Sequence, residues 1–256
     1  MAACERVRDY AYEITDPWTG RPLTLDANHH DRLVVTLFAR AFNTYWAALQ
    51  LCSTGFGEQA AMLNRSLFED MVDAHWICTE PQRAIELFEK HDTHGRMLLA
   101  DQVAKYPAWY PDLALPDFDP DERNHLDKLF GPYGARSWTT VSLHDRVTAI
   151  EHHWTKTEDQ EILRFFRDIP HRENNQILHV SAHALGNVVV ENGPEAFSVR
   201  LGPGTSMVDR SLFGAWWMFS QVVGLLVDHF EIQLDAGTRA ELFAADAFGA
   251  NGKPDG

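Results

Sequence analysis

The chain has 256 residues, 45% of them hydrophobic, and includes eight Trp and fifteen Phe. This composition can fill a folded core and excludes a wholly disordered protein. With 37 acidic against 22 basic residues the formal net charge is −15. Nonspecific binding to long nucleic acids or to anionic membranes is therefore disfavoured, because like charges repel. A local basic pocket for RNA stays compatible with this balance.

The cysteine pattern and the N-terminal sequence indicate in which cellular compartment the protein is expected. Cys4, Cys52 and Cys78 are odd in number and widely spaced, which indicates reduced thiols and not a disulfide framework or a thiolate zinc site. Residues 1–10 contain no apolar run of the kind found in secretory signals. We therefore expect a cytoplasmic protein.

The first part of the chain divides into an arm and long helices. Residues 1–28 have few periodic apolar positions and predict an irregular N-terminal arm, with room for a short helix. From His29 apolar residues recur at steps of three and four, which predicts a helix that ends near Gly55. A second helix follows, and Thr79-Glu80-Pro81 begins a third that runs toward Lys105, because proline is tolerated in a first turn.

The second half predicts shorter helices and one hairpin. Four prolines between Tyr106 and Pro120 indicate a loop, which we expect to be ordered because its aromatic residues need packing partners. Val188–Val190 and Phe197–Leu201 flank a turn and predict a small β-hairpin. The other predicted helices lie at about 120–131, 142–154, 157–170, 171–185 and 207–234, with a short one capped by Asp235.

These patterns predict an all-α protein, a multi-helix bundle with one small β-hairpin near residues 188–201. A single helical domain is expected over residues 29–248, followed by a disordered tail at 249–256. The segment Leu212–Val227 raises the question of a membrane helix. It has sixteen residues, whereas a spanning helix needs about 20, so we interpret it as the core helix of a soluble protein.

The segment Met62–Trp76, M-L-N-R-S-L-F-E-D-M-V-D-A-H-W, predicts the central helix, because its apolar side chains occur on nearly every side. Arg65 and Glu69 lie one turn apart among these apolar residues. An unpaired buried charge is costly, so the two are predicted to form a structural ion pair in the core. Asn64 and His75 share a neighbouring sector of the helix. A catalytic role for Arg65 and Glu69 is the alternative.

The stretch H-R-E-N-N-Q-I-L-H-V-S-A-H, from His171 to His183, is the leading candidate for catalysis. On one helix, its Arg172, His179 and His183 would lie within about 40° of one another. Arg binds phosphate and His transfers protons near neutral pH, so the pattern is typical of phosphodiester chemistry. The alternative is a solvated polar face with ordinary histidines. The candidate catalytic residues are Arg172, His179 and His183, with Asn175, Gln176 and Ser181 in supporting positions.

The segment Asn64–Ile77, N-R-S-L-F-E-D-M-V-D-A-H-W-I, resembles the R-S-L-x-E helix of an all-helical bacterial family of unknown function. Members of that family carry a second patch with Ser and His late in the chain. H-V-S-A-H-A-L-G, at His179–Gly186, is similar to that patch. The resemblance covers about residues 30–230. It implies a helical fold and no particular activity.

The catalytic stretch also resembles, more weakly, the motif of HEPN-type helical ribonucleases, in which four to six residues separate an Arg from a His. Six residues separate Arg172 from His179. In those proteins the residue after the Arg is usually polar, often Asn, whereas here Glu173 places an acid near the phosphate site. The resemblance implies metal-independent RNA processing of a toxin or defence type, with two copies of the motif across a homodimer.

Metal binding is the rival chemistry for the same stretch. The chain has 13 His, and His179-x-x-x-His183 has the spacing of two ligands on one helix. Val180 replaces the Glu of the H-E-x-x-H motif. The remaining short matches are Glu122-x-x-His125, His91-Asp92 and His144-Asp145. These fall short of a di-iron bundle or a metal phosphohydrolase, so we predict no metal site and no cofactor.

Two function classes follow from the sequence. The first is a HEPN-like protein that acts on RNA at a local site, with Arg172 on the phosphate and His179 as acid–base. The second is a non-enzymatic helical scaffold or oligomerisation module. A hydrolase that depends on a metal held by His and carboxylate ligands is a third alternative. No membrane partner is expected.

Overall fold

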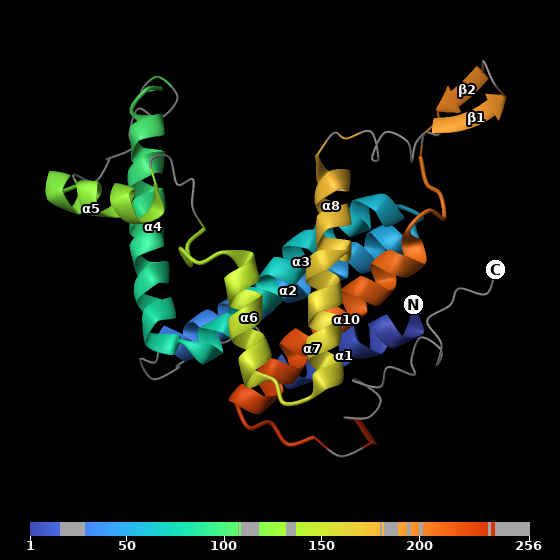
Figure 1. The fold of residues 1–256 in the computed structure, drawn as a ribbon, viewed down its shortest axis with the longest axis horizontal. Helices are drawn as coiled ribbons and strands as arrows, with labels where there is room; N and C mark the ends of the chain where they lie inside the picture. Colours follow the sequence, from blue (N-terminus) through green and yellow to red (C-terminus); the bar gives the residue numbers. More distant parts are fainter. Residues whose placement is uncertain are drawn as a thin grey trace.

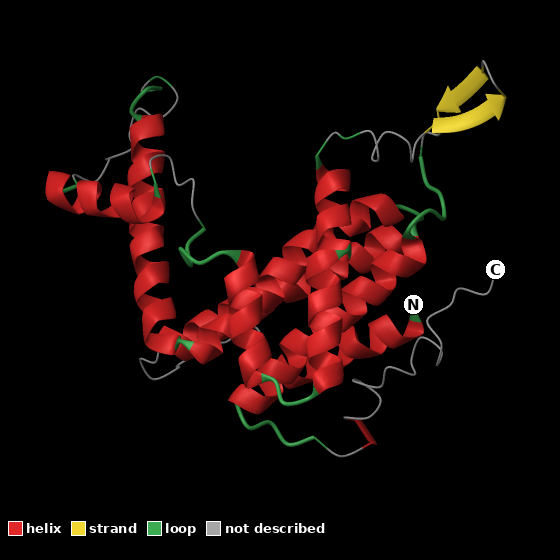
Figure 2. Cartoon of the chain, in the orientation of Figure 1, coloured by secondary structure: helices red, strands yellow, loops and turns green. Residues whose placement is uncertain are grey.

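The computed structural model is almost entirely helical in the residues that it describes (Figures 1 and 2). The described residues are 1–15, 29–106, 108, 118–131, 137–179, 181, 189–193, 196–199, 202–234 and 237–238. The helices are α1 (Ala2–Thr15), α2 (His29–Ser53), α3 (Gly57–Thr79), α4 (Pro81–Val103), α5 (Pro120–Phe130), α6 (Leu143–His153), α7 (Thr157–Asp168), α8 (Pro170–Leu178) and α10 (Val208–His229), and the strands are β1 (Val189–Gly193) and β2 (Ala196–Val199).

The predicted all-α bundle and its single hairpin are confirmed. Strands β1 and β2 pair antiparallel, with Val189 opposite Val199, and the hairpin projects from the bundle (Figure 2). Some predictions concern residues outside the described ranges. They are those for most of the proline-rich loop, for the last helix after Asp235 and for the tail at 249–256.

Helix α3 is the centre of the bundle, as its sequence predicts. Helices α2, α3 and α10 each pack against the other two, and α6 and α8 cover the remaining side of α3 (Figure 1). Apolar side chains on several sides of α3 are buried, among them Leu67, Met71, Val72 and Trp76. A helix enclosed in this way has to satisfy its polar groups inside the protein.

Helix α10 is a core helix. Among the described residues it is the one helix long and apolar enough to cross a membrane, and 72% of its apolar window is buried inside the protein. Its aromatic residues pack into the bundle, where Trp217 stacks on Phe166 at 4.5 Å between ring centroids and Phe219 stacks on Tyr45 at 4.4 Å. The interpretation of residues 212–227 as a core helix is supported by this burial.

The prediction of an irregular arm is wrong for residues 2–15, which form helix α1. This helix buries Cys4, Val7 and Ala11 against the bundle, and the Tyr45 hydroxyl donates to the Cys4 carbonyl at 2.8 Å. The spacing of three and four is present, but two of the three positions are small residues that give a weak apolar signal. Residues 16–28 lie outside the described ranges.

The predicted helix from His171 to about Leu185 is too long. Helix α8 ends at Leu178, and His179 has an extended backbone with φ −93° and ψ 140°. The Ser181 hydroxyl donates to the Gln176 carbonyl at 2.8 Å. That side chain satisfies a carbonyl that a further helical turn would have used, so the helix can end there.

Helices α4 and α5 form an arm that stands away from the bundle (Figure 1). The guanidinium of Arg123 on α5 binds both carboxylate oxygens of Asp101 on α4, at 2.7 and 2.9 Å. Next to this pair the buried His94 ring contacts Asp127 at 2.9 Å and stacks on Phe130. The two helices therefore hold each other through polar contacts as well as apolar ones.

The start of α3 is seated against the segment that leads into α10. Phe56 forms a parallel bridge with Gly204, and a Cβ atom at Gly57 would overlap the backbone of Ser206 and Met207. Glycine is required at position 57 because any side chain would push α3 away from the start of α10.

We expect Gly57→Ala to lower the free energy of unfolding by about 1–3 kcal/mol, because the added methyl group overlaps backbone atoms and not a flexible side chain. The matched control is Gly95→Ala within α4, where an added Cβ meets nothing within 4 Å. That variant should gain about 0.5–1 kcal/mol from helix propensity. Denaturant unfolding of the two variants measures the difference, and equal stabilities would contradict this packing.

Candidate functional site

The central helix α3 carries a row of charged residues along one side. Arg65, Glu69 and Asp73 follow one another at steps of four residues. The Arg65 guanidinium lies 3.3 Å from the Glu69 carboxylate, so the two side chains form an ion pair. The side chains of Arg65 and Glu69 are 28% and 39% exposed, so the pair lies at the edge of the core and not within it.

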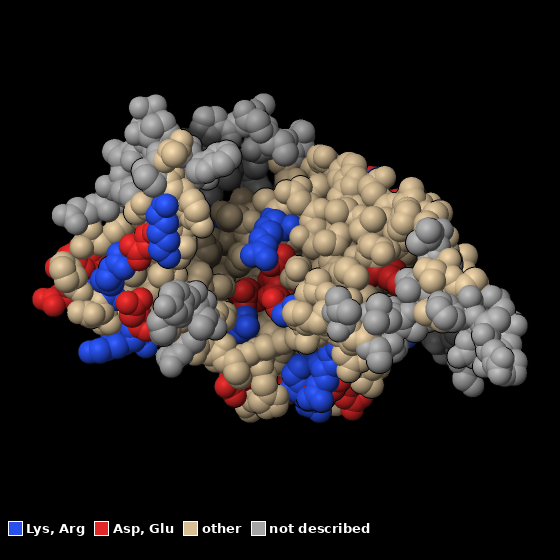
Figure 3. Space-filling view, turned by 90° about the horizontal axis from the view of Figure 1, so that it is seen from above, with Lys and Arg blue, Asp and Glu red and all other residues tan. Residues whose placement is uncertain are grey.

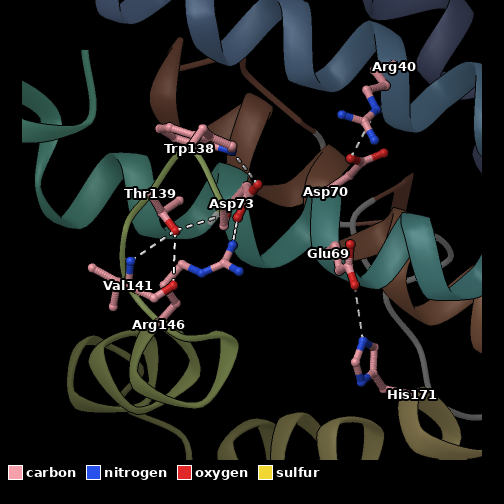
Figure 4. A network of polar contacts seen from close by, with 10 residues as sticks. Arg40, Glu69, Asp70, Asp73, Trp138, Thr139, Val141, Arg146 and His171 are labelled. Carbon is pink, nitrogen blue, oxygen red and sulfur yellow. Dashed lines mark hydrogen bonds and ion pairs between the residues drawn. The ribbon is translucent and has the colours of Figure 1, made fainter. Parts of the chain in front are cut away.

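Glu69 has a second partner that comes from α8. The Nε2 atom of His171 lies 3.3 Å from the same Glu69 carboxylate oxygen that contacts Arg65, and the His171 side chain is 16% exposed (Figure 4). The hydrogen bond from His171 lowers the pKa of Glu69 below its usual value, and the charges of Arg65 and Arg146 act in the same direction. Glu69 is therefore ionised at neutral pH and can hold one nitrogen of the imidazole ring.

Asp73 fixes α6 and the turn before it onto α3. The buried Arg146 of α6 forms an ion pair with Asp73, and the Trp138 indole donates to the other carboxylate oxygen at 2.8 Å (Figure 4). The buried Thr139 hydroxyl closes the turn by donating to the Val141 carbonyl at 3.0 Å. Burial lowers the pKa of Arg146 to about 10. This group is enclosed and structural.

Asp70 faces the opposite neighbour, α2. Its side chain is 2% exposed and lies 3.2 Å from the guanidinium of Arg40 (Figure 4). Burial raises the pKa of Asp70 to about 6, although the charge of Arg40 acts against this shift. Burial therefore disfavours the ionised form of Asp70, and the charge of the exposed Arg40 offsets part of this cost.

A pocket with a volume of about 240 Å³ lies between α3, α7, α8 and α10. Its polar wall consists of Asn64, His171 and Asn174, of which Asn64 and Asn174 are buried. At the rim, the Arg210 guanidinium binds the Glu173 carboxylate at 3.0 and 2.5 Å. The apolar wall is mainly aromatic: Phe68, Phe165, Phe166, Phe213, Met207 and Met218.

Asn64 connects the pocket wall on α3 to α10. Its Nδ2 atom donates to the Ser211 carbonyl at 2.8 Å, and the Ser211 hydroxyl donates in turn to the Gly57 carbonyl. The Asn64 Oδ1 atom is buried and has no hydrogen-bond partner among the described residues. A buried acceptor without a partner is costly, because its hydrogen bond to water is lost on folding.

The structure brings His171 to the site, and the sequence interpretation missed it. His171, Asn174 and Ile177 recur at steps of three and face α3, so this is the inner face of α8. The ring of His171 lies against Phe68 at 5.4 Å between centroids. The spacing of three carries this signal, but the two adjacent apolar residues Ile177 and Leu178 obscure it, because only Ile177 is buried. Leu178 is in fact 43% exposed.

Two of the predicted catalytic residues, Arg172 and His179, do not lie on one helix face. Arg172, Gln176 and His179 are exposed on the outer side of α8 or beyond its end, and Asn175 is half-buried. Because His179 lies past the last helical residue, it does not share a helix face with Arg172. Ser181 contacts the end of the helix, and His183 lies outside the described residues. The ribonuclease-like helix motif is therefore not formed by Arg172 and His179.

His75 belongs to the core and stands apart from this pocket. Its ring packs edge-on against Trp154 at 5.2 Å between centroids and contacts the Gln221 backbone of α10. Burial lowers the pKa of His75 to about 4, so the ring is neutral near pH 7. The expectation of a structural histidine fits these contacts.

Charged residues of both signs meet at the surface near the centre of the molecule. Seen from above, basic and acidic side chains lie together beside a hollow (Figure 3). The acidic chain thus has a place where cationic groups are concentrated next to carboxylates.

A family model matches residues 31–195 of the chain; it is described as a family of unknown function (DUF5677). This protein belongs to the DUF5677 family. The matched range runs from α2 past β1 and includes Arg65, Glu69 and His171, whereas the α10 wall of the pocket follows it. No curated protein and no solved structure was found to match this DUF5677 chain. The resemblance to an all-helical family of unknown function is confirmed, and the HEPN likeness has no counterpart among these findings.

We expect Arg146→Met to lower the free energy of unfolding by about 3–5 kcal/mol, because it leaves the Asp73 carboxylate buried without its cation. The matched control is Arg164→Met. Arg164 pairs with Glu151 at 3.3 Å but is 47% exposed, so its loss should be below about 1 kcal/mol. Denaturant unfolding measures both values. A loss for Arg146→Met as small as that of the control would show that the Asp73 network is not structural.

We expect the stability of the protein to depend on pH through Asp70. Because the folded-state pKa of about 6 lies above the unfolded value of 3.8, Asp70 costs stability as the pH rises from about 4 to about 6. Asp70→Asn should therefore gain on the order of 1–3 kcal/mol relative to wild type between pH 4 and pH 7.5. Unfolding at both pH values, with the exposed Asp121→Asn as control, tests this. A pH-independent difference would contradict the shift.

Proposed function

We propose that this DUF5677 protein is a metal-independent acid–base catalyst that acts on RNA, with His171 as the proton-transfer residue in place of His179. The observation that carries the proposal is the contact of His171 with Glu69 beside the pocket between α3, α8 and α10. A carboxylate that holds one imidazole nitrogen fixes the tautomer and leaves the other nitrogen for proton transfer.

Each residue has a definite role in this proposal. His171 takes the proton of a ribose 2′-hydroxyl, the 2′-oxygen attacks the adjacent phosphorus, and the 5′-oxygen leaves and takes a proton from water. The products are a 2′,3′-cyclic phosphate and a 5′-hydroxyl end. Glu69 is the positioning residue for His171, and Arg65 holds the Glu69 carboxylate. Arg172, exposed beside His171, supplies the positive charge for the phosphate.

The pocket suits one planar, partly polar group. Its volume of about 240 Å³ lies just below the range of pockets for drug-sized ligands. Aromatic side chains stack on nucleobases without regard to sequence. His171 and Asn174 add polar groups to the same pocket wall. A single base of a flexible strand fits this combination better than a duplex, which the net charge of −15 would also repel.

The proposal includes a homodimer and a reducing compartment. We expect the dimer contact at Leu178, an apolar residue at the end of α8 that is 43% exposed in the single chain. A monomer at working concentration in solution scattering would contradict this part. Cys4, Cys52 and Cys78 are free thiols, in agreement with a cytoplasmic location.

A non-enzymatic scaffold is the second candidate function, and one observation favours it. The arm of α4 and α5 stands away from the bundle (Figure 1), and its residue Leu99 is 63% exposed. Exposed apolar residues on a projecting helix pair are typical of a surface for protein partners.

The RNA proposal is tested by cleavage of mixed cellular RNA in EDTA. Wild type is expected to cleave, His171→Ala to lose at least about 100-fold in rate, and Glu69→Gln to lose less because it only orients the histidine. The matched control is His179→Ala, an exposed histidine at the other end of the same helix, which should keep its rate.

Two results would overturn the proposal. Folded wild type that leaves RNA intact would make the scaffold the leading function. Equal losses of cleavage rate in His171→Ala and His179→Ala would indicate that the catalytic residues do not include His171 alone and lie at the outer face of α8 as well.

A further inference from the structure

The N-terminus of α2 and the C-terminus of α10 meet at one end of the bundle. His30 and Asp31 lie in the first turn of α2, and His229 is the last residue of α10. The Nε2 atom of His229 lies 2.7 Å from the Asp31 carboxylate, and the rings of His30 and His229 are 4.9 Å apart between centroids at an angle of 78°. Residues 198 positions apart in sequence therefore converge at one point.

The three side chains can each offer one ligand atom to a common centre. These atoms, a nitrogen from each histidine and a carboxylate oxygen, lie within 4.8 Å of one another, and all three residues are half-buried. Around a bound zinc ion, ligand bonds of about 2.0–2.2 Å place neighbouring ligand atoms about 3–3.5 Å apart. Small side-chain rotations would close the cluster to that size.

The surroundings of His30 favour a metal ligand. One nitrogen of its ring donates to the backbone carbonyl of Ile77 on α3. Metal-binding histidines usually donate their second nitrogen to such a carbonyl, which fixes the tautomer and the ring orientation.

We propose that His30, Asp31 and His229 bind one divalent transition-metal ion that links α2 to α10. Two imidazole nitrogens and one carboxylate oxygen suit zinc, cobalt, nickel or iron(II), whereas magnesium and calcium prefer sites made of oxygen. Three protein ligands leave at least one coordination position for water or a small ligand. This site lies on elements other than α8 and is independent of the RNA proposal.

The simpler alternative is a structural ion pair without a metal. Asp31 at a helix N-terminus and His229 at a helix C-terminus both complement the helix dipoles. An ion pair needs these two residues only. The metal site also needs His30, so a variant at that position separates the two interpretations.

The test uses the full chain, stripped of metal with EDTA and dialysed, to which zinc or cobalt(II) chloride is then added. Equilibrium dialysis measures the stoichiometry and affinity, and thermal unfolding measures the change in Tm. The variants are His30→Ala, which keeps the Asp31–His229 pair, and His229→Ala. His153→Ala is the control for adventitious binding, because that histidine is exposed on α6. Magnesium chloride is the control ion.

We expect about one zinc per chain and a rise in Tm of about 5 °C at saturating zinc, with no rise in magnesium. His30→Ala and His229→Ala should each lose the rise and bind zinc at least about tenfold more weakly, whereas His153→Ala should behave as wild type. Zinc affinity that His30→Ala retains in full would overturn the proposal. The absence of tight zinc binding by wild type would also overturn the proposal. The Asp31–His229 contact would then be a structural ion pair without a metal.

Discussion

A helix that is covered on several sides has to pair its polar side chains inside the protein, and this constraint organises the bundle around α3. Four polar residues of α3 bind four different neighbouring helices. Asn64 binds α10. Asp70 binds α2, Asp73 binds α6 and Glu69 binds α8 (Figure 4). Because an unpaired buried charge costs several kcal/mol, these pairs fix the register of the four helices against α3.

The four contacts differ in solvent exposure. This difference distinguishes contacts that only stabilise the fold from the one that can take part in a reaction. The Asp73 group is enclosed by Trp138 and Arg146, and Asp70 is buried against α2. Glu69 and His171 are the pair that solvent reaches, and they stand next to the pocket that Asn64 lines. A proton-transfer group must contact its substrate, so the open pair is the one that can carry chemistry. The structural pairs hold it in place.

The sequence predicted most of the fold and part of the site, for physical reasons. Apolar residues on every side of Met62–Trp76 indicated the central helix, and the cost of buried charge indicated the Arg65–Glu69 pair. The end of α8 was not predictable from periodicity, because Ser181 ends the helix through a local side-chain contact. His171 could not be assigned to Glu69 either, since 102 positions separate them and only the packing of α8 on α3 brings them together.

The central claim, that Glu69 joins α8 to α3 through His171, is tested most directly by a double-mutant cycle. The free energy of unfolding is measured for Glu69→Gln, His171→Gln and the double variant, with His179→Gln replacing His171→Gln in a reference cycle. We predict a coupling of about 0.5–1 kcal/mol between Glu69 and His171 and none beyond about 0.3 kcal/mol between Glu69 and His179. Equal couplings in the two cycles would contradict the account.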